Sequence, residues 1–153
     1  RFETITKKEN LTKVIKELQK VTKMIKLLFI LHPPTRIFLK KHGLYKILKE
    51  DPNCELLPRQ DFFHFNKLLK SAEFVITDGG SNQEECFYLG IPCLLLRNET
   101  ERIEGLGHNV VISNFDSAVI NNFIFDYKLY RREPISKTTS PSQIIIDHLI
   151  EFT

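Results

Sequence analysis

Apolar runs of strand length and amphipathic stretches of helix length alternate along most of the chain. Continuous apolar runs that end at turn residues are typical of strands covered on both faces, whereas apolar residues spaced by three or four positions are typical of helices. This pattern predicts strands over residues 2–6, 26–31, 54–57, 74–77, 93–97 and 108–113. It predicts helices that start after a cap at Asn10 and near Pro34, and further helices over residues 61–71, 81–89 and 141–152.

The alternation predicts an α/β fold, a Rossmann-like parallel sheet with helices on both faces and right-handed crossovers. A length of 153 residues and an apolar fraction of 42% suit one domain, so residues 1–153 are expected to form a single unit. The chain starts at Arg1 without an initiator Met, and we expect it to be a piece of a longer protein. There the segment 130–153 would carry a helix that crosses to another domain.

The composition does not favour nucleic acid or a membrane as a partner. The 22 basic and 19 acidic side chains are spread along the chain, and no motif of a nucleic-acid recognition module is present. No apolar run approaches the roughly 18 residues of a membrane helix. Three cysteines without a CxxC pair indicate neither a disulfide framework nor a zinc site. Free thiols and a cytoplasmic location are therefore expected.

The segment Asp78-Gly79-Gly80-Ser81 joins the predicted strand 74–77 to the helix that follows it. Ligands of open α/β sheets lie beyond the carboxyl ends of the strands, where glycines let the backbone approach and helix N-termini offer N–H groups. The segment therefore suits a diphosphate, with Ser81 as an added hydroxyl donor, but a tight turn with a Ser cap explains it equally well. Neither GxxxxGK[ST] nor GxGxxG is present, which weighs against mononucleotide kinases and dinucleotide oxidoreductases.

Ionisable side chains add further candidates. Glu84 and Glu85 lie on the first turns of the predicted helix, where the dipole favours carboxylates even without a ligand. One carboxylate about a turn beyond a phosphate loop is also well placed to accept hydrogen bonds from ribose hydroxyls. His32 ends a predicted strand on the side of the expected cleft and is the candidate catalytic residue. Structural roles are expected for His42, His64, His108 and His148.

The glycine turn belongs to a longer series of motifs. Residues 77–85 read TDGGSNQEE, residues 89–97 read LGIPCLLLR, and residues 100–104 read TERIE. The series resembles the UDP-N-acetylglucosamine 2-epimerase family, which has TDSGG-x-QEE, LG-x-P and R-x-x-T-E-R-P-E at this spacing. Residues 7–10 and 31–34 further resemble the family's H-R-x-E-N turn and its strand-end His before Asn-Pro. The match spans roughly residues 2–113.

The resemblance implies one half of a GT-B-like two-domain fold, in which a UDP-sugar binds between two Rossmann-like domains. This chain would be the second, UDP-binding domain. Its partners would be the UDP-sugar and a missing N-terminal domain, and a homodimer of the longer protein is a further expectation. The implied reaction converts UDP-N-acetylglucosamine to the N-acetylmannosamine form by loss of UDP followed by re-addition or hydrolysis, within cell-surface polysaccharide biosynthesis. Because the other domain would supply most acid/base carboxylates, this chain alone is expected to bind UDP without turnover. The resemblance implies no metal or redox cofactor.

Carried over residue by residue, the resemblance implies UDP contacts from Gly79, Gly80 and Ser81 at the diphosphate, Glu85 at the ribose, Phe65 near the uracil, and Arg102 at the phosphates or in support of its loop. Two positions depart from the family. Gly79 and Ser81 exchange the places of the family's Ser and Gly, and Thr6 replaces the His of the H-R-x-E-N turn. Two alternatives therefore stay open, the donor domain of a GT-B glycosyltransferase and a non-catalytic sugar-nucleotide-binding protein.

Overall fold

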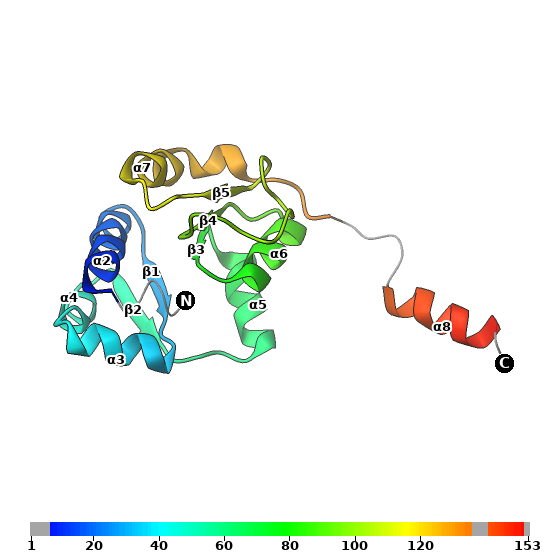
Figure 1. Cartoon of the computed structure of the whole chain (residues 1–153), viewed down its shortest axis with the longest axis horizontal. Coiled ribbons are helices and arrows are strands. Elements are labelled where there is room, and N and C mark those ends of the chain that lie inside the picture. Colours follow the sequence, from blue (N-terminus) through cyan, green and yellow to red (C-terminus); the bar gives the residue numbers. More distant parts are fainter. Residues whose placement is uncertain (1–6, 136–140, 152–153) are drawn as a thin grey trace.

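The computed structural model describes residues 7–135 and 141–151, and these form an α/β body followed by one separate helix (Figure 1). The strands are β1 (Leu27–Ile30), β2 (Cys54–Leu57), β3 (Val75–Thr77), β4 (Cys93–Leu95) and β5 (Val110–Ile112). The helices are α2 (Lys8–Thr22), α3 (Pro33–Lys41), α4 (Tyr45–Lys49), α5 (Phe62–Ser71), α6 (Gly80–Leu89), α7 (Ser117–Asp126), the 3₁₀ helix η1 (Tyr127–Tyr130) and α8 (Pro141–Glu151).

All strand pairs in the described residues are parallel, as the alternation of strands and helices predicts. They form two ladders, β1-β2 and β3-β4-β5, and no hydrogen-bonded pairing joins β1 to β3. The α/β class with parallel strands that the sequence predicts is confirmed. The strand predicted over residues 2–6 lies outside the described residues, so its pairing stays a prediction.

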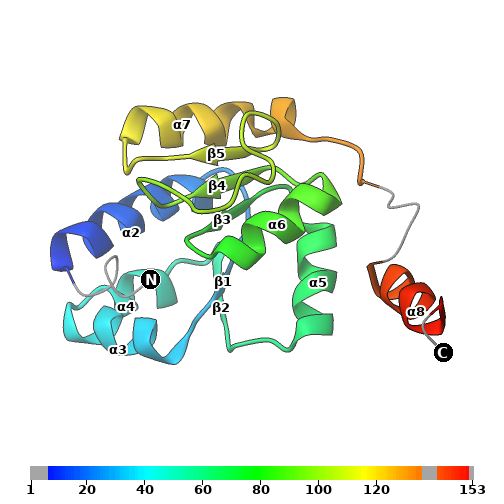
Figure 2. The ribbon, with the colours of Figure 1, turned by 45° about the vertical axis from the view of Figure 1, so that its right-hand side comes forward.

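The β4 strand shows why helices cover both faces of the larger ladder. Successive side chains of a strand point to opposite faces. Cys93 and Leu95 accordingly join a buried cluster with Leu69 of α5 and Cys86 of α6, whereas Leu94 joins Phe123 of α7 in another. Figure 2 shows α7 on one side of this ladder and α5 and α6 on the other. All three β4 residues are buried, so their apolar run is the pattern of a doubly covered strand.

Helix starts follow local chemistry, with one correction. Asp61 caps α5 by accepting a hydrogen bond from the His64 amide at 2.9 Å, and α3 opens with Pro33 at its first position. The cap predicted at Asn10 is wrong, because α2 already begins at Lys8 after Lys7, which makes no side-chain cap bond. Lys and Glu are good helix formers, and they extend the helix past the asparagine.

The α8 helix lies apart from the body in both ribbon views (Figures 1 and 2). Its start at Pro141 agrees with the prediction, and Ile145, Leu149 and Ile150 are exposed on it. The crossing of this helix to another domain stays a prediction.

Gly90 ends α6 in the left-handed region at φ 66°, and its carbonyl accepts a hydrogen bond from the Arg132 amide at 2.9 Å. A Cβ at this position would overlap the carbonyl of Arg132, whereas at Gly43, φ 73°, it would meet nothing within 4 Å. The left-handed conformation costs a non-glycine residue about 1–2 kcal/mol at either position. Only at Gly90 does a steric clash add to that cost.

We therefore expect Gly90→Ala to lower the free energy of unfolding by at least about 1 kcal/mol more than Gly43→Ala, or roughly 2–4 °C in Tm. Thermal and urea unfolding of the two variants measure this difference. Equal losses would show that residues 131–133 do not pack on Gly90 in solution.

Candidate functional site

The turn after β3 is fixed by the hydroxyl of Thr77. Thr77 Oγ1 accepts hydrogen bonds from the Gly79 amide at 3.1 Å and from Asn82 Nδ2 at 2.8 Å. Gly79 then serves as the N-cap of α6 in an extended conformation, and Gly80 is the first helical residue. The predicted glycine turn is thus confirmed as a strand-to-helix junction at the carboxyl end of a parallel strand.

The first turn of α6 presents backbone donors. The amides of Gly80, Ser81 and Asn82 donate to no group in the described part of the chain, as is usual for the start of a helix. The helix dipole adds positive potential at the same place. Ser81 is exposed there, so its hydroxyl is accessible to a ligand. This end of α6 therefore suits an anion.

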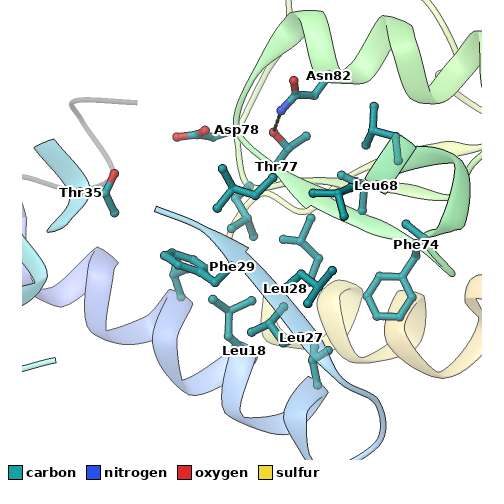
Figure 3. A pocket seen from close by; sticks show the side chains of 18 of the residues that line it. Leu18, Leu27, Leu28, Phe29, Thr35, Leu68, Phe74, Thr77, Asp78 and Asn82 are labelled. Atoms are coloured by element: carbon teal, nitrogen blue, oxygen red, sulfur yellow. Dashed lines mark hydrogen bonds between the residues drawn. The ribbon is translucent and has the colours of Figure 1, made fainter. Parts of the chain in front are cut away.

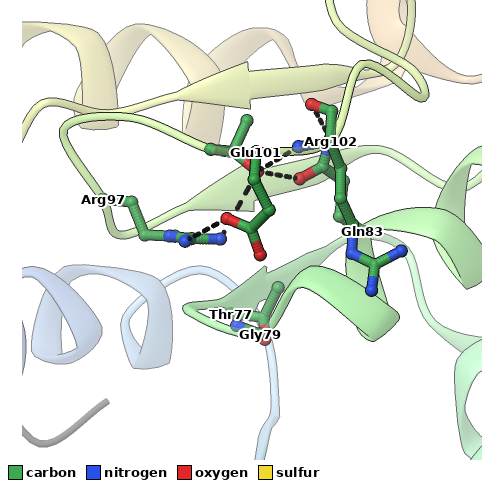
Figure 4. A network of polar contacts seen from close by, with 7 residues as sticks. Thr77, Gly79, Gln83, Arg97, Glu101 and Arg102 are labelled. Carbon is green, nitrogen blue, oxygen red and sulfur yellow. Dashed lines mark hydrogen bonds and ion pairs between the residues drawn. The ribbon is translucent and has the colours of Figure 1, made fainter.

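The side chain of Arg102 lies against Gly80, and Figure 4 shows Arg102 beside Gln83 of α6. A Cβ on Gly80 would come within 2.7 Å of Arg102 Nε, so only a glycine allows the guanidinium to approach the helix this closely. Arg102 forms an ion pair with Glu84 through its Nη1, while its Nε is buried and has no hydrogen-bond partner among the residues that the structure describes. The Arg102 guanidinium thus lies next to the three backbone amides at the start of α6, and its Nε–H remains available to a ligand.

Gln83 holds the loop that carries Arg102. Its side chain is completely buried, and its Nε2 donates to the carbonyls of Arg102 at 3.1 Å and Glu104 at 2.9 Å. Thr100 Oγ1 in turn donates to Gln83 Oε1 at 2.8 Å. Since Gln83 lies on α6 itself, these bonds fix the loop against the helix whose N-terminus faces Arg102.

A second arginine, Arg97, also holds the loop that carries Arg102. Arg97 follows β4 with only 6% of its side chain exposed, and its Nη2 donates to Glu101 Oε2 at 2.7 Å. The other carboxylate oxygen of Glu101 lies near Gly80, 3.2 Å from the position a Cβ would take. Analysis of the sequence alone did not single out Gln83, Arg97 or Glu101. All three lie in the motifs that carry the family resemblance, and this position in the motifs could have identified them as residues of the site.

The two acidic residues of α6 differ in environment. Glu84 forms an ion pair with Arg102, whereas the buried Oε2 of Glu85 has no hydrogen-bond partner within residues 7–135 and 141–151. Desolvation, with a smaller contribution from the charge of Glu84, raises the pKa of Glu85. A carboxylate that lacks a partner beside an anion site is suited to accept hydrogen bonds from a ligand.

The remaining predicted residues lie at other places. His32 caps the start of α3 at the end of β1, is exposed, and shares the lining of a large cavity with Thr77 and Asp78. Phe65 of α5 is half-buried: it packs against the Leu69 cluster and also lines that cavity. The structure therefore brings together the glycine turn, Ser81, the glutamates and Arg102, while the role of Phe65 at the uracil stays a prediction.

Comparison with known proteins identifies the family of this chain. The family model for UDP-N-acetylglucosamine 2-epimerase matches residues 1–138. The chain belongs to this family. It is 31% identical over 124 residues to a UDP-N-acetylglucosamine 2-epimerase homolog of Methanococcus maripaludis, a match that covers 80% of this chain and 34% of the relative. It is 27% identical over 151 residues to the UDP-N-acetylglucosamine 2-epimerase of Methanocaldococcus jannaschii, covering 95% of this chain and 41% of that one.

Solved structures of epimerases share the fold. The Methanocaldococcus jannaschii enzyme in complex with UDP-GlcNAc and UDP superposes over 100% of this chain and 43% of its own, with a TM-score of 0.79 and 25% identity. The Neisseria meningitidis epimerase bound to UDP-GlcNAc covers 97% of this chain and 41% of its own, with a TM-score of 0.74 and 23% identity. This epimerase-family chain thus spans well under half the length of the relatives it matches.

Within residues 7–135 and 141–151, no three His, Cys, Asp or Glu side chains gather closely enough to hold a metal ion. The same residues contain no helix of the length and apolarity that a membrane span requires.

The raised pKa of Glu85 gives a stability prediction. A carboxyl whose pKa is higher in the folded than in the unfolded state favours folding below its ordinary pKa and loses this contribution as the pH rises through the folded value. We expect Glu85→Gln, which cannot ionise, to be more stable than the original chain at pH 7 and to lose this advantage near pH 4 and below. Urea unfolding across this range measures it, with exposed Glu99→Gln as the control for net charge. A variant less stable at pH 7 would contradict the assignment.

Proposed function

We propose that this chain is the nucleotide-binding domain of a two-domain enzyme that epimerises UDP-N-acetylglucosamine at C2. The observation that carries the proposal is the N-terminus of α6 with Arg102 lying over Gly80. Three backbone amides that have no partner in the described part of the chain, together with a guanidinium, are suited to a diphosphate, which carries its charge on closely spaced oxygens. Membership of the epimerase family and the fold shared with UDP-bound relatives support uridine as the base.

In this proposal the diphosphate lies against the amides of Gly80 and Ser81, with Arg102 Nε donating to it. The ribose hydroxyls donate to Glu85, whose partnerless oxygen gains the hydrogen bonds that it lacks in the free protein. The uracil lies farther along the carboxyl edge, toward Phe65 and the β2 end near residues 57–59. Gly79 forms the turn that precedes the first residue of α6.

The chemistry needs a base for the C2 proton and stabilisation of the departing UDP. This chain supplies the second requirement through Arg102 and the helix N-terminus. His32 is the proposed base on this domain, and a facing domain would contribute the remaining acid/base groups. Because a missing general acid or base costs about 10²- to 10⁴-fold, the complete cleft is required for turnover.

Two alternatives share the same nucleotide site, a GT-B glycosyltransferase donor domain and a non-catalytic sugar-nucleotide-binding protein. Family membership favours epimerisation over glycosyl transfer. The three free cysteines support a reducing compartment, so we place the enzyme in the cytoplasm, where UDP-sugars for surface polysaccharides would be interconverted. Incubating the longer protein with UDP-N-acetylglucosamine in D₂O tests the reaction, because removal and return of the C2 proton would introduce deuterium there.

Titration calorimetry with UDP, ADP and pyrophosphate tests the site in this chain. We expect UDP to bind more tightly than ADP, and we expect Glu85→Gln to weaken UDP on the order of tenfold or more while leaving pyrophosphate nearly unchanged. A charge-assisted hydrogen bond contributes about 1.5–3 kcal/mol, and only UDP has the ribose. Equal losses for both ligands would place Glu85 away from the ribose, and equal affinity for ADP would exclude a uridine site.

The two glycines of the turn provide a matched pair of variants. In Gly80→Ala the new methyl group displaces the Arg102 side chain, whereas in Gly79→Ala its nearest neighbours are 3.4 Å or more away, an ordinary contact distance. We expect Gly80→Ala to weaken pyrophosphate and UDP alike by on the order of tenfold, and Gly79→Ala to change either affinity by less than about threefold. The same titrations measure this. Equal effects of both substitutions would remove Arg102 from the anion site.

A further inference from the structure

The carboxylate of Glu101 reaches the same point of α6 as the Arg102 guanidinium. Its Oε1 lies 3.2 Å from the position that a Cβ on Gly80 would take, and Arg102 Nε lies 2.7 Å from that position. Figure 4 shows the Glu101 side chain between those of Arg97 and Arg102, with its carboxylate directed toward the glycine turn. A negative and a positive group therefore both border the start of the helix.

An ion pair with a buried arginine holds the Glu101 carboxylate in this place. Its Oε2 accepts a hydrogen bond from Arg97 Nη2 at 2.7 Å, and Arg97 is almost fully buried after β4. The Glu101 side chain itself is 58% exposed, so much of it remains in contact with solvent. A phosphate bound at the start of α6 would therefore lie near a fixed negative charge as well as near hydrogen-bond donors.

The positive side chains of this site are matched by negative ones. Arg97 pairs with Glu101, and Arg102 pairs with Glu84. Asp78 adds a further carboxylate just before the turn, where it lines the neighbouring cavity (Figure 3). The described side chains thus bring no excess of positive charge to the turn. The helix N-terminus, equivalent to roughly half an elementary charge, favours an anion of low charge over one of high charge.

The ligands of the proposed function differ in charge at the phosphate that is linked to the sugar. In a UDP-sugar this phosphate is bridged on both sides and carries a single negative charge. In UDP the same phosphate is terminal, and it gains a second charge when its last proton is lost, at about pH 6. A nearby carboxylate repels that second charge, and it does so more strongly the closer the two groups lie.

We propose that Glu101 is a specificity-determining residue of the nucleotide site, whose carboxylate disfavours the terminal phosphate of UDP relative to the esterified diphosphate of a UDP-sugar. The inference rests on the proposed function, because it places the diphosphate at Gly80. The α6 N-terminus and Arg102 attract both ligands, so Glu101 acts on the ratio of the two affinities. Its effect is to keep free UDP from occupying the site at the expense of the nucleotide sugar.

Titration calorimetry of the 153-residue chain with UDP-N-acetylglucosamine and with UDP tests this ratio. Glu101→Gln removes the charge and retains an oxygen for Arg97, and the exposure of the side chain lets the variant fold. At pH 8 we expect the variant to bind both ligands more tightly, with an additional gain of about two- to fourfold for UDP, the effect of one charge at about 5 Å in water. Glu99→Gln removes a charge from an exposed residue of the same loop and is the control, in which UDP shows no additional gain.

Repeating the titrations at pH 5 separates charge from structure. The terminal phosphate of UDP keeps its last proton there, so we expect the additional gain for UDP to disappear. The other charged or titratable side chains around the turn and its cavity are the same in both proteins and cancel from the comparison. They are Asp78, Glu84, Glu85, Arg97, Arg102 and His32.

An additional gain for UDP at pH 8 that is absent at pH 5 supports the proposal. Equal changes for the two ligands, weaker binding of both, or an additional gain of the same size at both pH values would overturn it and leave Glu101 as a support for its loop. In each of these cases both ligands still bind, so the proposed function stands. If the unmodified chain binds neither ligand, the proposed function fails together with this inference.

Discussion

The buried side chain of Gln83 is the interaction on which the site depends. A primary amide without hydrogen bonds in a protein interior is unfavourable by several kcal/mol, so its donors and acceptor must be satisfied together. The partners of Gln83 all belong to residues 100–104, and Gln83 itself lies one turn into α6. The helix and the loop therefore hold one arrangement, with Arg102 over Gly80. A shift of the loop would leave two carbonyls and an amide unpaired in the core.

This arrangement follows from the parallel ladder beneath it. Thr77 ends β3 and Arg97 follows β4, so parallel pairing brings both to the same edge. After β3 the chain forms the glycine turn and α6, and after β4 it forms the loop that carries Arg102. The anion site is thus made by two neighbouring strand ends. The glycine lets them approach, and the glutamine joins them.

The sequence predicts the parts of the molecule whose contacts are local. The apolar run before Asp78, the two glycines and the stop at Gly90 locate β3, the turn and α6 closely, because each is determined by residues next to it in the chain. The helix α7 was not predicted, although Asp116 accepts a hydrogen bond from the Ala118 amide in the manner of a cap. Its apolar side chains alternate with Asn121 and Asn122, which weakens the helical pattern.

The rest of the site depends on contacts between distant residues. Gln83 meets carbonyls 19 and 21 positions away, and Glu84 meets Arg102 across 18. No spacing rule indicates that Glu84 rather than Glu85 would take the arginine, because that choice depends on where the loop packs. The same holds for Phe65, whose helical spacing is compatible with a ligand-facing or a core position. In the structure it packs on the Leu69 cluster and also lines the cavity.

Two buried polar atoms that lack hydrogen-bond partners among the described residues belong to the proposed site. Glu85 Oε2 lies on α6 and Arg102 Nε lies over its first residue, whereas a third such atom, His42 Nε2, lies at the end of α3. Unpaired buried polar groups lower the stability of the free protein. A ligand that pairs with both atoms removes that penalty on binding. The instability of the empty site therefore increases the affinity for such a ligand. An arginine and a carboxylate that paired with each other at these atoms would be more stable when empty and would bind less tightly. Instead, Arg102 pairs with Glu84 through Nη1. This ion pair holds the guanidinium in place and leaves Nε–H available to a ligand.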